Sequence, residues 1–352
     1  MNTIWIVPIE PIDSRYTQQW YDNIPVLVAK HAGDRWRVTT VDGEQIKSGT
    51  STGGFLDWGA TNVYKASQTE AIGRLFSGGA VQAGDRFLIT DAWNFVITAI
   101  RYMSDLMQIP VEIHGIWHAG AYDPTDILGM QMTKPWPWHS ERGWFYACDV
   151  NYYATNFHRD MFLSNLSIPE HEQARAVRSG QPHELIVAGL VARRQNDKWR
   201  QVIWPHRYNE DKQPEIAEDL VGRIGANLVI TQKLNLSKEE YYDQLGRSLV
   251  TLSTSLHENL GISQMEGCLT GSLPCVPDRA SYSEMYLPCF KYPTEWTSSW
   301  ENYQKHSDQL VAFVNNLVVN YDSYQTELAE QNQILIERYL NCSVMLERLV
   351  KS

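Results

Sequence analysis

Short apolar runs alternate with helical stretches along roughly the first 165 residues, and this alternation limits the folds open to the chain. Consecutive parallel strands need a crossover, usually a helix, so the pattern predicts an α/β fold with a parallel sheet covered on both faces. The expected strands are Thr3–Ile9, Trp36–Val41, Arg86–Thr90, Val111–Ile116 and Tyr152–Ala154. The expected helices include Ala92–Met107 and Arg142–Asp149, while Val26–Ala29 fits a helix end or a short strand.

A polar stretch, Ser167–Gln181, interrupts the alternation and predicts a linker, because it contains Pro169 and Gly180. A second alternating series follows it. Its expected strands are Leu185–Ala188, Gln201–Pro205, Asn227–Thr231, Ser248–Ser253 and Leu273–Val276. Its expected helices are Pro214–Ile224, Ser237–Gly246 and Ser263–Thr270.

Apolar residues recur at helical spacing through the tail, 301–352, which predicts helices packed on the second domain and crossing back to the first, with a coiled-coil segment as the alternative. The predicted organisation is therefore an N-terminal domain, 1–168, a second domain, 183–300, and C-terminal helices, 301–352. Two α/β halves in series imply a central cleft, because ligands of open α/β sheets bind beyond the carboxyl ends of the strands.

The composition is that of a globular protein, with 43% hydrophobic and 20% charged residues. The net charge of −11 shows no basic surface of the kind that grips nucleic acid, although a total does not exclude a local basic groove. The five cysteines form no CxxC pair, so we expect reduced thiols in a cytoplasmic protein. The first residues lack a basic region, and no run of 18 apolar residues occurs, so neither a signal peptide nor a membrane span is predicted.

Basic residues follow the predicted strand Gln201–Pro205 in the segment Trp204–Lys212. Arg207 and Lys212 at the carboxyl end of a strand could hold both phosphates of a nucleoside diphosphate, since Arg forks onto phosphate oxygens and Lys adds a mobile charge. They would also stabilise the negative charge that grows on a departing diphosphate. The alternative interpretation is a solvated loop with a local Arg–Glu pair.

Two carboxylates, Glu258 and Glu266, flank the turn Gly261–Ser263 about fifty residues after Arg207. Carboxylates accept hydrogen bonds from sugar hydroxyls, and backbone N–H groups at a helix start hold phosphate. The alternatives are a helix N-terminal acid for Glu258 and a solvated helix position for Glu266. The pattern indicates a site for a polyhydroxylated, phosphorylated ligand.

Together these segments resemble the donor half of GT-B glycosyltransferases, particularly the retaining family 4. Two segments are similar to the corresponding segments of the tRNA-queuosine mannosyltransferase-like group: WPHRYNEDKQPE (204–215) and HENLGISQMEGCLTGSLPCVPDRASYSE (257–284). Phage enzymes that glycosylate hydroxymethylated DNA bases have a similar donor domain. The resemblance covers roughly residues 185–300. It implies a GT-B architecture, with two Rossmann-like domains facing a central cleft and a helical C-terminal tail.

The resemblance also implies roles for individual residues. Arg207 and Lys212 would bind the donor diphosphate, Glu266 the ribose, and Glu258 the hydroxyls of the transferred sugar. The amides of Gly261, Ile262 and Ser263 would touch phosphate or sugar. Family members often have Ala where this chain has Gly267, and the pocket for the base is expected near Val187–Leu190 or Thr231–Leu234.

In the first domain, family members often place a histidine after the fourth or fifth strand, facing the sugar. His118 is the first choice here and His114 the second, with a satisfied core histidine as the alternative for either. The loop after the first strand usually shapes the acceptor site and contains glycines, which this chain lacks there. Asp13, Arg15 and Tyr16 stand in their place and are predicted to bind the acceptor. Asp91, after the strand Arg86–Thr90, is expected to cap a helix from Ala92 onward, with a position facing the cleft as the alternative.

Trp136 and Trp138, beside Lys134 and Arg142, are predicted to stack on an acceptor base, with a Pro-rich loop folded on itself as the alternative. The predicted function is transfer of a hexose or pentose from a UDP- or GDP-sugar, with the UDP-sugar as first choice, to a hydroxyl of a modified nucleobase, first of all 5-hydroxymethylpyrimidine in phage DNA. Queuosine in tRNA, a polysaccharide, a lipid or a small molecule are alternative acceptors.

No DxD-type pair suggests a metal, and no Schiff-base lysine suggests a pyridoxal-phosphate phosphorylase. The expected partners are therefore a nucleotide-sugar co-substrate and a nucleic acid, with no cofactor, no metal and no membrane. A nucleotide-sugar epimerase on the same fold and a nucleotide-sugar-binding module that has lost its chemistry are the other functional classes left open. The sequence says nothing about the oligomeric state.

Overall fold

The computed structural model describes residues 1–12, 15–46 and 57–351. Internal contacts divide it into two compact units, Met1–Pro182 with Cys342–Ser352, and His183–Asn341. The first unit therefore includes the stretch predicted as a linker, and its last helix comes from the far end of the chain. Most of the tail belongs to the second unit.

The first unit is built on a parallel six-stranded sheet in the order β2-β1-β3-β4-β5-β6. Its strands are β1 (Thr3–Val7), β2 (Arg37–Thr40), β3 (Arg86–Ile89), β4 (Glu112–Ile116), β5 (Val150–Tyr153) and β6 (Ala176–Arg178). β1 and β3 are buried at every residue, as expected for strands covered on both faces. Within the described residues this is a Rossmann-like domain.

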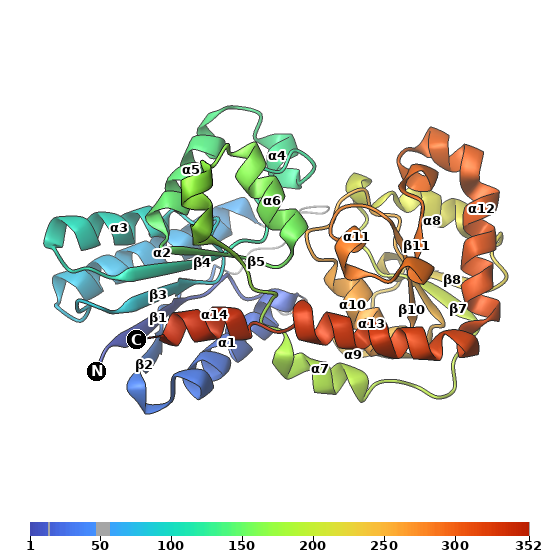
Figure 1. Cartoon of the computed structure of the whole chain (residues 1–352), viewed down its shortest axis with the longest axis horizontal. Coiled ribbons are helices and arrows are strands. Elements are labelled where there is room, and N and C mark those ends of the chain that lie inside the picture. The colour runs from blue at the N-terminus through green and yellow to red at the C-terminus, as the bar shows by residue number, and fades with distance from the viewer. Residues whose placement is uncertain (13–14, 47–56, 352) are drawn as a thin grey trace. The chain divides into compact units, whose positions relative to one another are not determined.

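Helices cover both faces of this sheet (Figure 1). Residues of α2, α3, α5 and α6 pack on one face with Trp5, Phe87 and Ile113. Residues of α1 and α14 pack on the other with Ile4, Ile6 and Leu88, and α14 lies beside α1 (Figure 1). The helices are α1 (Tyr16–Ala32), α2 (Trp58–Ser77), α3 (Val96–Met107), α4 (Ile127–Gln131), α5 (Trp136–Ala147), α6 (Asn156–Asn165) and α14 (Ser343–Val350).

The second unit has a parallel five-stranded sheet in the order β11-β10-β9-β7-β8. Its strands are β7 (Gln201–Trp204), β8 (Asn227–Ile230), β9 (Val250–Leu252), β10 (Leu273–Pro277) and β11 (Lys291–Tyr292). Its helices are α7 (Glu184–Val191), α8 (Pro214–Leu220), α9 (Lys238–Arg247), α10 (Ile262–Leu269), α11 (Tyr282–Met285), α12 (Trp300–Val319) and α13 (Gln325–Arg338). α10 packs against α7, α9 and α13, whereas α12 packs against α8.

The two-sheet α/β prediction is confirmed, but several elements differ from those expected. The predicted strand Leu185–Ala188 lies inside α7. The prediction was wrong because an apolar run of four residues is too short for its periodicity to distinguish a strand from a helix. The predicted linker Ser167–Gln181 contains β6, which pairs with β5. Val26–Ala29 lies near the C-terminal end of α1, which agrees with the helix-end alternative and not with a strand.

The helix expected from Ala92 begins only at Val96, and Phe95 precedes it. Asp91 is therefore not its N-cap. Instead, its carboxylate lies 3.0 Å from Lys65 Nζ and also accepts a hydrogen bond from the backbone N–H of Trp93. The prediction failed because Asp91 has a long-range cationic partner on α2.

Candidate functional site

The loops that follow β7, β9 and β10 share one edge of the second sheet, because parallel strands bring their carboxyl ends to the same side. Side chains brace these loops against one another. The Gln213 amide donates to Thr254 O at 2.6 Å, and the Arg279 guanidinium donates to Ser255 O at 2.9 Å. These bonds, the first buried and the second partly buried, tie the loop after β9 to the loops after β7 and β10.

Lys212 is buried at this edge and lies among four acceptors. Its Nζ is 2.8 Å from Glu258 Oε1 and 2.9 Å from Asp211 Oδ2. It is also 3.0 Å from Ser255 Oγ and 2.7 Å from His257 O. An ammonium group has three N–H donors, so these four acceptors already use its hydrogen-bonding capacity. A phosphate oxygen would have to replace one of them.

The charges of this cluster support one another. Burial opposes the charge on Lys212, but the carboxylates of Glu258 and Asp211 outweigh burial and raise the pKa of the ammonium group. Burial likewise opposes ionisation of Glu258, yet Lys212 outweighs it and holds the pKa of Glu258 below its usual value. Both groups are therefore ionised at neutral pH.

His206 completes the cluster, two residues after β7. Its Nδ1 lies 3.6 Å from Glu258 Oε1. Burial, helped by the nearby Lys212 and Arg207 and opposed by Glu258, lowers its pKa to about 3. His206 is therefore a neutral imidazole beside a charged pair.

Arg207 is exposed and follows His206 directly. Its position after β7 places it at the same edge as Lys212, and its charge is close enough to lower the pKa of His206. Its role toward a diphosphate stays a prediction.

Glu266 has different partners from Glu258, although only eight positions separate the two. It is buried on α10 and faces α9. Tyr242 OH donates to Oε1 and Tyr241 OH to Oε2, each at 3.0 Å, and Lys238 Nζ lies 3.2 Å from Oε1. The two carboxylates thus belong to two adjoining polar clusters.

Gly261 precedes α10 as its N-cap, with φ 74° and ψ 57°, the left-handed conformation that glycine tolerates. A Cβ there would lie 2.5 Å from the Tyr282 ring, so no side chain fits without movement. Ile262 and Ser263 form the first turn of α10 and are partly exposed. Their backbone N–H groups precede the first internal bonds of the helix, as an anion site requires.

In the first unit, two predicted residues meet. Tyr16 OH lies 3.3 Å from His118 Nδ1, and His118 Nε2 lies 2.7 Å from Thr90 O. A carbonyl oxygen only accepts, so Nε2 carries the proton and Nδ1 accepts from Tyr16. Burial lowers the pKa of His118, which keeps the ring neutral. His114 is fully buried and bonded to Tyr152 OH, so it is a satisfied core histidine.

The other described residues predicted to bind the acceptor lie near the start of α1 and in the first turn of α5. Arg15 precedes α1 as its N-cap, next to Tyr16, and Asp13 lies outside the described residues. Trp136 and Trp138 lie in the first turn of α5 rather than in a loop, because Pro135 and Pro137 are compatible with a helix start. Trp136 is 56% and Trp138 47% exposed, and the Trp138 indole donates to Ala121 O. Their stacking role stays a prediction.

Several site residues were missed by the sequence reasoning. Asp211 adjoins Lys212 in the chain, so it could have been suspected. Lys238, Tyr241 and Tyr242 stand three and four positions apart, a spacing that puts them on one face of α9. Glu141 on α5, a fully buried carboxyl group outside these clusters, had no recognisable sequence signal either. Its Oε1 accepts from the Trp93 indole at 2.9 Å and from Ala121 N at 2.5 Å.

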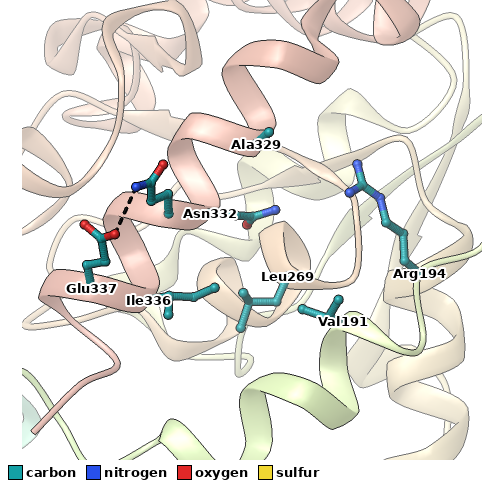
Figure 2. A pocket seen from close by; sticks show the side chains of 8 residues that line it. Val191, Arg194, Leu269, Ala329, Asn332, Ile336 and Glu337 are labelled. Atoms are coloured by element: carbon teal, nitrogen blue, oxygen red, sulfur yellow. Dashed lines mark hydrogen bonds between the residues drawn. The ribbon is translucent and has the colours of Figure 1, made fainter.

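A shallow groove of about 370 Å³ lies elsewhere on the second unit (Figure 2). Val191 of α7, Leu269 of α10, and Asn332 and Ile336 of α13 line it. Leu269 is the last residue of α10, whereas Gly261 precedes the first, so the groove and the Lys212 cluster lie at opposite ends of this helix.

The described residues contain no group of three or more His, Cys, Asp or Glu side chains suited to a metal ion. None of the helices in the described ranges is both long and apolar enough to cross a membrane.

No protein-family model matches the chain. A curated tRNA-queuosine alpha-mannosyltransferase from Drosophila melanogaster is 27% identical over 128 residues, which is 28% of this chain and 34% of that protein. The match therefore spans about a third of the length of that relative.

Solved structures resemble the whole chain at low sequence identity. OtsA in its apo form aligns with a TM-score of 0.64, 12% identity and 100% coverage of both chains. The catalytic domain of Starch Synthase IV from Arabidopsis thaliana, bound to ADP and acarbose, aligns with a TM-score of 0.61 and 10% identity, covering 99% of this chain and 97% of that one. Such likeness establishes the fold. The chain has the GT-B fold of glycosyltransferases, with two Rossmann-like domains.

Proposed function

We propose that the chain is a retaining glycosyltransferase that moves a hexose or pentose from a nucleotide sugar, a UDP- or GDP-sugar, to a hydroxyl of a modified nucleobase. The observation that carries this proposal is the meeting of Lys212, Glu258 and the start of α10 at one sheet edge. A cation, a sugar-binding carboxylate and N–H groups at a helix start are the groups that a nucleotide sugar requires.

In this proposal Arg207 and Lys212 bind the diphosphate and stabilise it as it leaves. Ile262 and Ser263 offer amides to a phosphate, Glu258 binds hydroxyls of the transferred sugar, and Glu266 accepts from the ribose. The Tyr241 and Tyr242 hydroxyls would hold the Glu266 carboxylate in place for that contact. The departing diphosphate takes the proton of the incoming hydroxyl on the same face, which is how the configuration is retained.

For the acceptor side we propose His118, Arg15, Tyr16, Trp136 and Trp138. The exposed indoles of α5 suit stacking on an extruded base, because every base has a π-face. The acceptor that we propose in first place is 5-hydroxymethylpyrimidine in phage DNA. The second is queuosine in tRNA, which the match to a tRNA-queuosine mannosyltransferase favours.

The test is a two-step assay on the full chain. A panel of UDP-, GDP- and ADP-sugars is first screened by thermal shift and by release of the nucleoside diphosphate. The active donor is then combined with DNA carrying 5-hydroxymethylpyrimidines and, separately, with queuosine tRNA. Binding of a nucleotide sugar with no turnover on either acceptor would favour the binding module or another acceptor class.

Two variants test the assigned residues. Arg207→Ala and Glu266→Ala should each reduce transfer at least about a hundredfold while the protein stays folded. Arg200→Ala is the control, because Arg200 is an exposed arginine at the opposite end of β7, where it donates to Gly225 O. Unchanged turnover in both site variants would contradict the assignment.

A further inference from the structure

Gln264 and His206 form a buried chain of contacts that ends on Glu258. Gln264 is the third residue of α10 and is 0% exposed, and His206 is 3% exposed. Gln264 Nε2 lies 3.4 Å from His206 Nε2, and His206 Nδ1 lies 3.6 Å from Glu258 Oε1. Neither Gln264 nor His206 was predicted as a site residue.

The chemistry of these groups fixes their directions. An amide nitrogen donates and does not accept, so His206 Nε2 must accept from Gln264. The single proton of the neutral imidazole then lies on Nδ1, where it faces the Glu258 carboxylate. Glu258 Oε1 thus has the His206 Nδ1–H at 3.6 Å on one side and the ammonium of Lys212 at 2.8 Å on the other, so the histidine acts on the carboxylate through the attraction of its N–H dipole.

We propose that Gln264 and His206 are positioning residues, in which Gln264 selects the Nδ1–H tautomer of His206 and this N–H orients the Glu258 carboxylate. This inference rests on the proposed function, in which Glu258 binds the transferred sugar. Since both contacts go to Oε1, Oε2 is left to accept from a sugar hydroxyl. The Glu258 side chain is 16% exposed, so a ligand can reach it.

Histidine NMR tests the tautomer without any assay of activity. In the ¹⁵N-histidine-labelled full chain, the His206 signals are identified by their loss in His206→Gln. We expect the wild type to carry its proton on Nδ1. Gln264→Glu should move the proton to Nε2 or protonate the ring, because a carboxylate accepts where the amide donated. An Nε2–H wild type would overturn the proposal.

Kinetics test the consequence for the sugar. Gln264→Leu should lower kcat about ten- to a hundredfold, as expected for a misplaced sugar-binding carboxylate. The affinity for UDP, GDP or ADP, whichever binds the wild type most tightly, should stay within about twofold, because these ligands lack the sugar. Gln201→Leu is the control, a buried glutamine at the amino end of β7 that bonds Gln244 and Ser248.

The outcomes separate this inference from the proposed function. If no nucleotide sugar is turned over, the proposed function fails and the NMR result still decides the tautomer. If Gln264→Leu leaves transfer unchanged, or weakens nucleotide binding in step with kcat, the positioning role is wrong even though the enzyme is a glycosyltransferase.

Discussion

Lys212 Nζ lies 2.8 Å from Glu258 Oε1, at the edge of the second sheet where the loops after β7 and β9 meet. The two side chains are 8% and 16% exposed, so the pair is largely removed from water. Forty-six positions separate them in the chain, and the fold alone brings them together. An ion pair in such surroundings has consequences for stability as well as for binding.

Breaking this ion pair should destabilise the second unit, and removing Lys212 should cost more stability than removing the charge of Glu258. Lys212→Met leaves the carboxylates of Glu258 and Asp211 without their cation and should cost about 3 kcal/mol. Glu258→Gln leaves Lys212 paired with Asp211 and should cost about 1 kcal/mol. The double variant should cost less than the sum, because the pair interacts directly.

Hydrogen exchange of the amides in β7 and β9 measures these effects in the second unit itself. Lys305→Met, which breaks an exposed pair with Glu301 on α12, is the control and should change stability little. Additive effects of the Lys212 and Glu258 substitutions would show that the two charges do not stabilise one another.

The start of α10 should be sensitive to any side chain at position 261. Gly261→Ala combines the left-handed strain with a contact of 2.5 Å to the Tyr282 ring, so we expect a loss of about 2 kcal/mol or more. Gly189→Ala on α7 is the matched control, because a Cβ there meets nothing within 4 Å. That control should stabilise the protein by about 0.5–1 kcal/mol, since alanine favours a helix. Urea denaturation measures both, and equal effects of the two substitutions would contradict the argument.

The sequence was sufficient to predict the two parallel sheets, because fully buried runs such as β1 and β10 are recognisable by composition. It was not sufficient for α7, whose apolar run Leu185–Ala188 resembles a strand. It also misjudged Asp91, since the partner of that carboxylate is Lys65, on a distant helix. Local patterns identify elements, but they do not report which charged side chains meet across loops.

The same limit applies to the candidate site. The spacing and the family resemblance predict four donor-site residues, which are Arg207, Lys212, Glu258 and Glu266. However, nothing in their spacing indicated that Glu258 faces Lys212 while Glu266 faces the tyrosines of α9. His206 and Gln264 could not be predicted from the sequence, because a histidine and a glutamine 58 positions apart form no motif. Only the distances between Gln264, His206 and Glu258 connect them to the site.

We expect position 267 to tolerate only glycine, because Thr251 lies against it. A Cβ at position 267 would lie 2.3 Å from Thr251 Oγ1, because α10 packs closely on β9 there. Gly267→Ala should therefore destabilise the second unit by about 1–3 kcal/mol. Thr251→Ala removes the hydroxyl and methyl group that obstruct the Cβ, so the double variant should recover part of that loss. Urea denaturation of the two single variants and the double variant checks this, and no recovery would show that the Cβ of residue 251, 2.9 Å from the added Cβ, is limiting.

Glu141 should make the stability of the first unit depend on pH. Burial raises the pKa of this carboxyl group to about 7, although hydrogen bonds from Ala121 and Trp93 oppose the shift. The folded chain thus keeps a proton that the unfolded chain releases near its ordinary pKa of 4.5. The associated stability is complete below pH 4.5 and is lost as the pH rises to about 7, by about 3 kcal/mol in all.

Glu141→Gln should remove this dependence, because an amide does not titrate. Its oxygen can still accept from Trp93 and Ala121, but its N–H groups replace Glu141 Oε2, a buried atom with no hydrogen-bond partner among the described residues. The variant should therefore be less stable than the wild type at pH 5, by about 1–2 kcal/mol. At pH 8.5 it should equal or exceed the wild type. Urea midpoints from pH 5 to pH 8.5 test this, with Glu70→Gln, an exposed position on α2, as the control. Parallel curves for wild type and Glu141→Gln would mean that Glu141 does not titrate in this range.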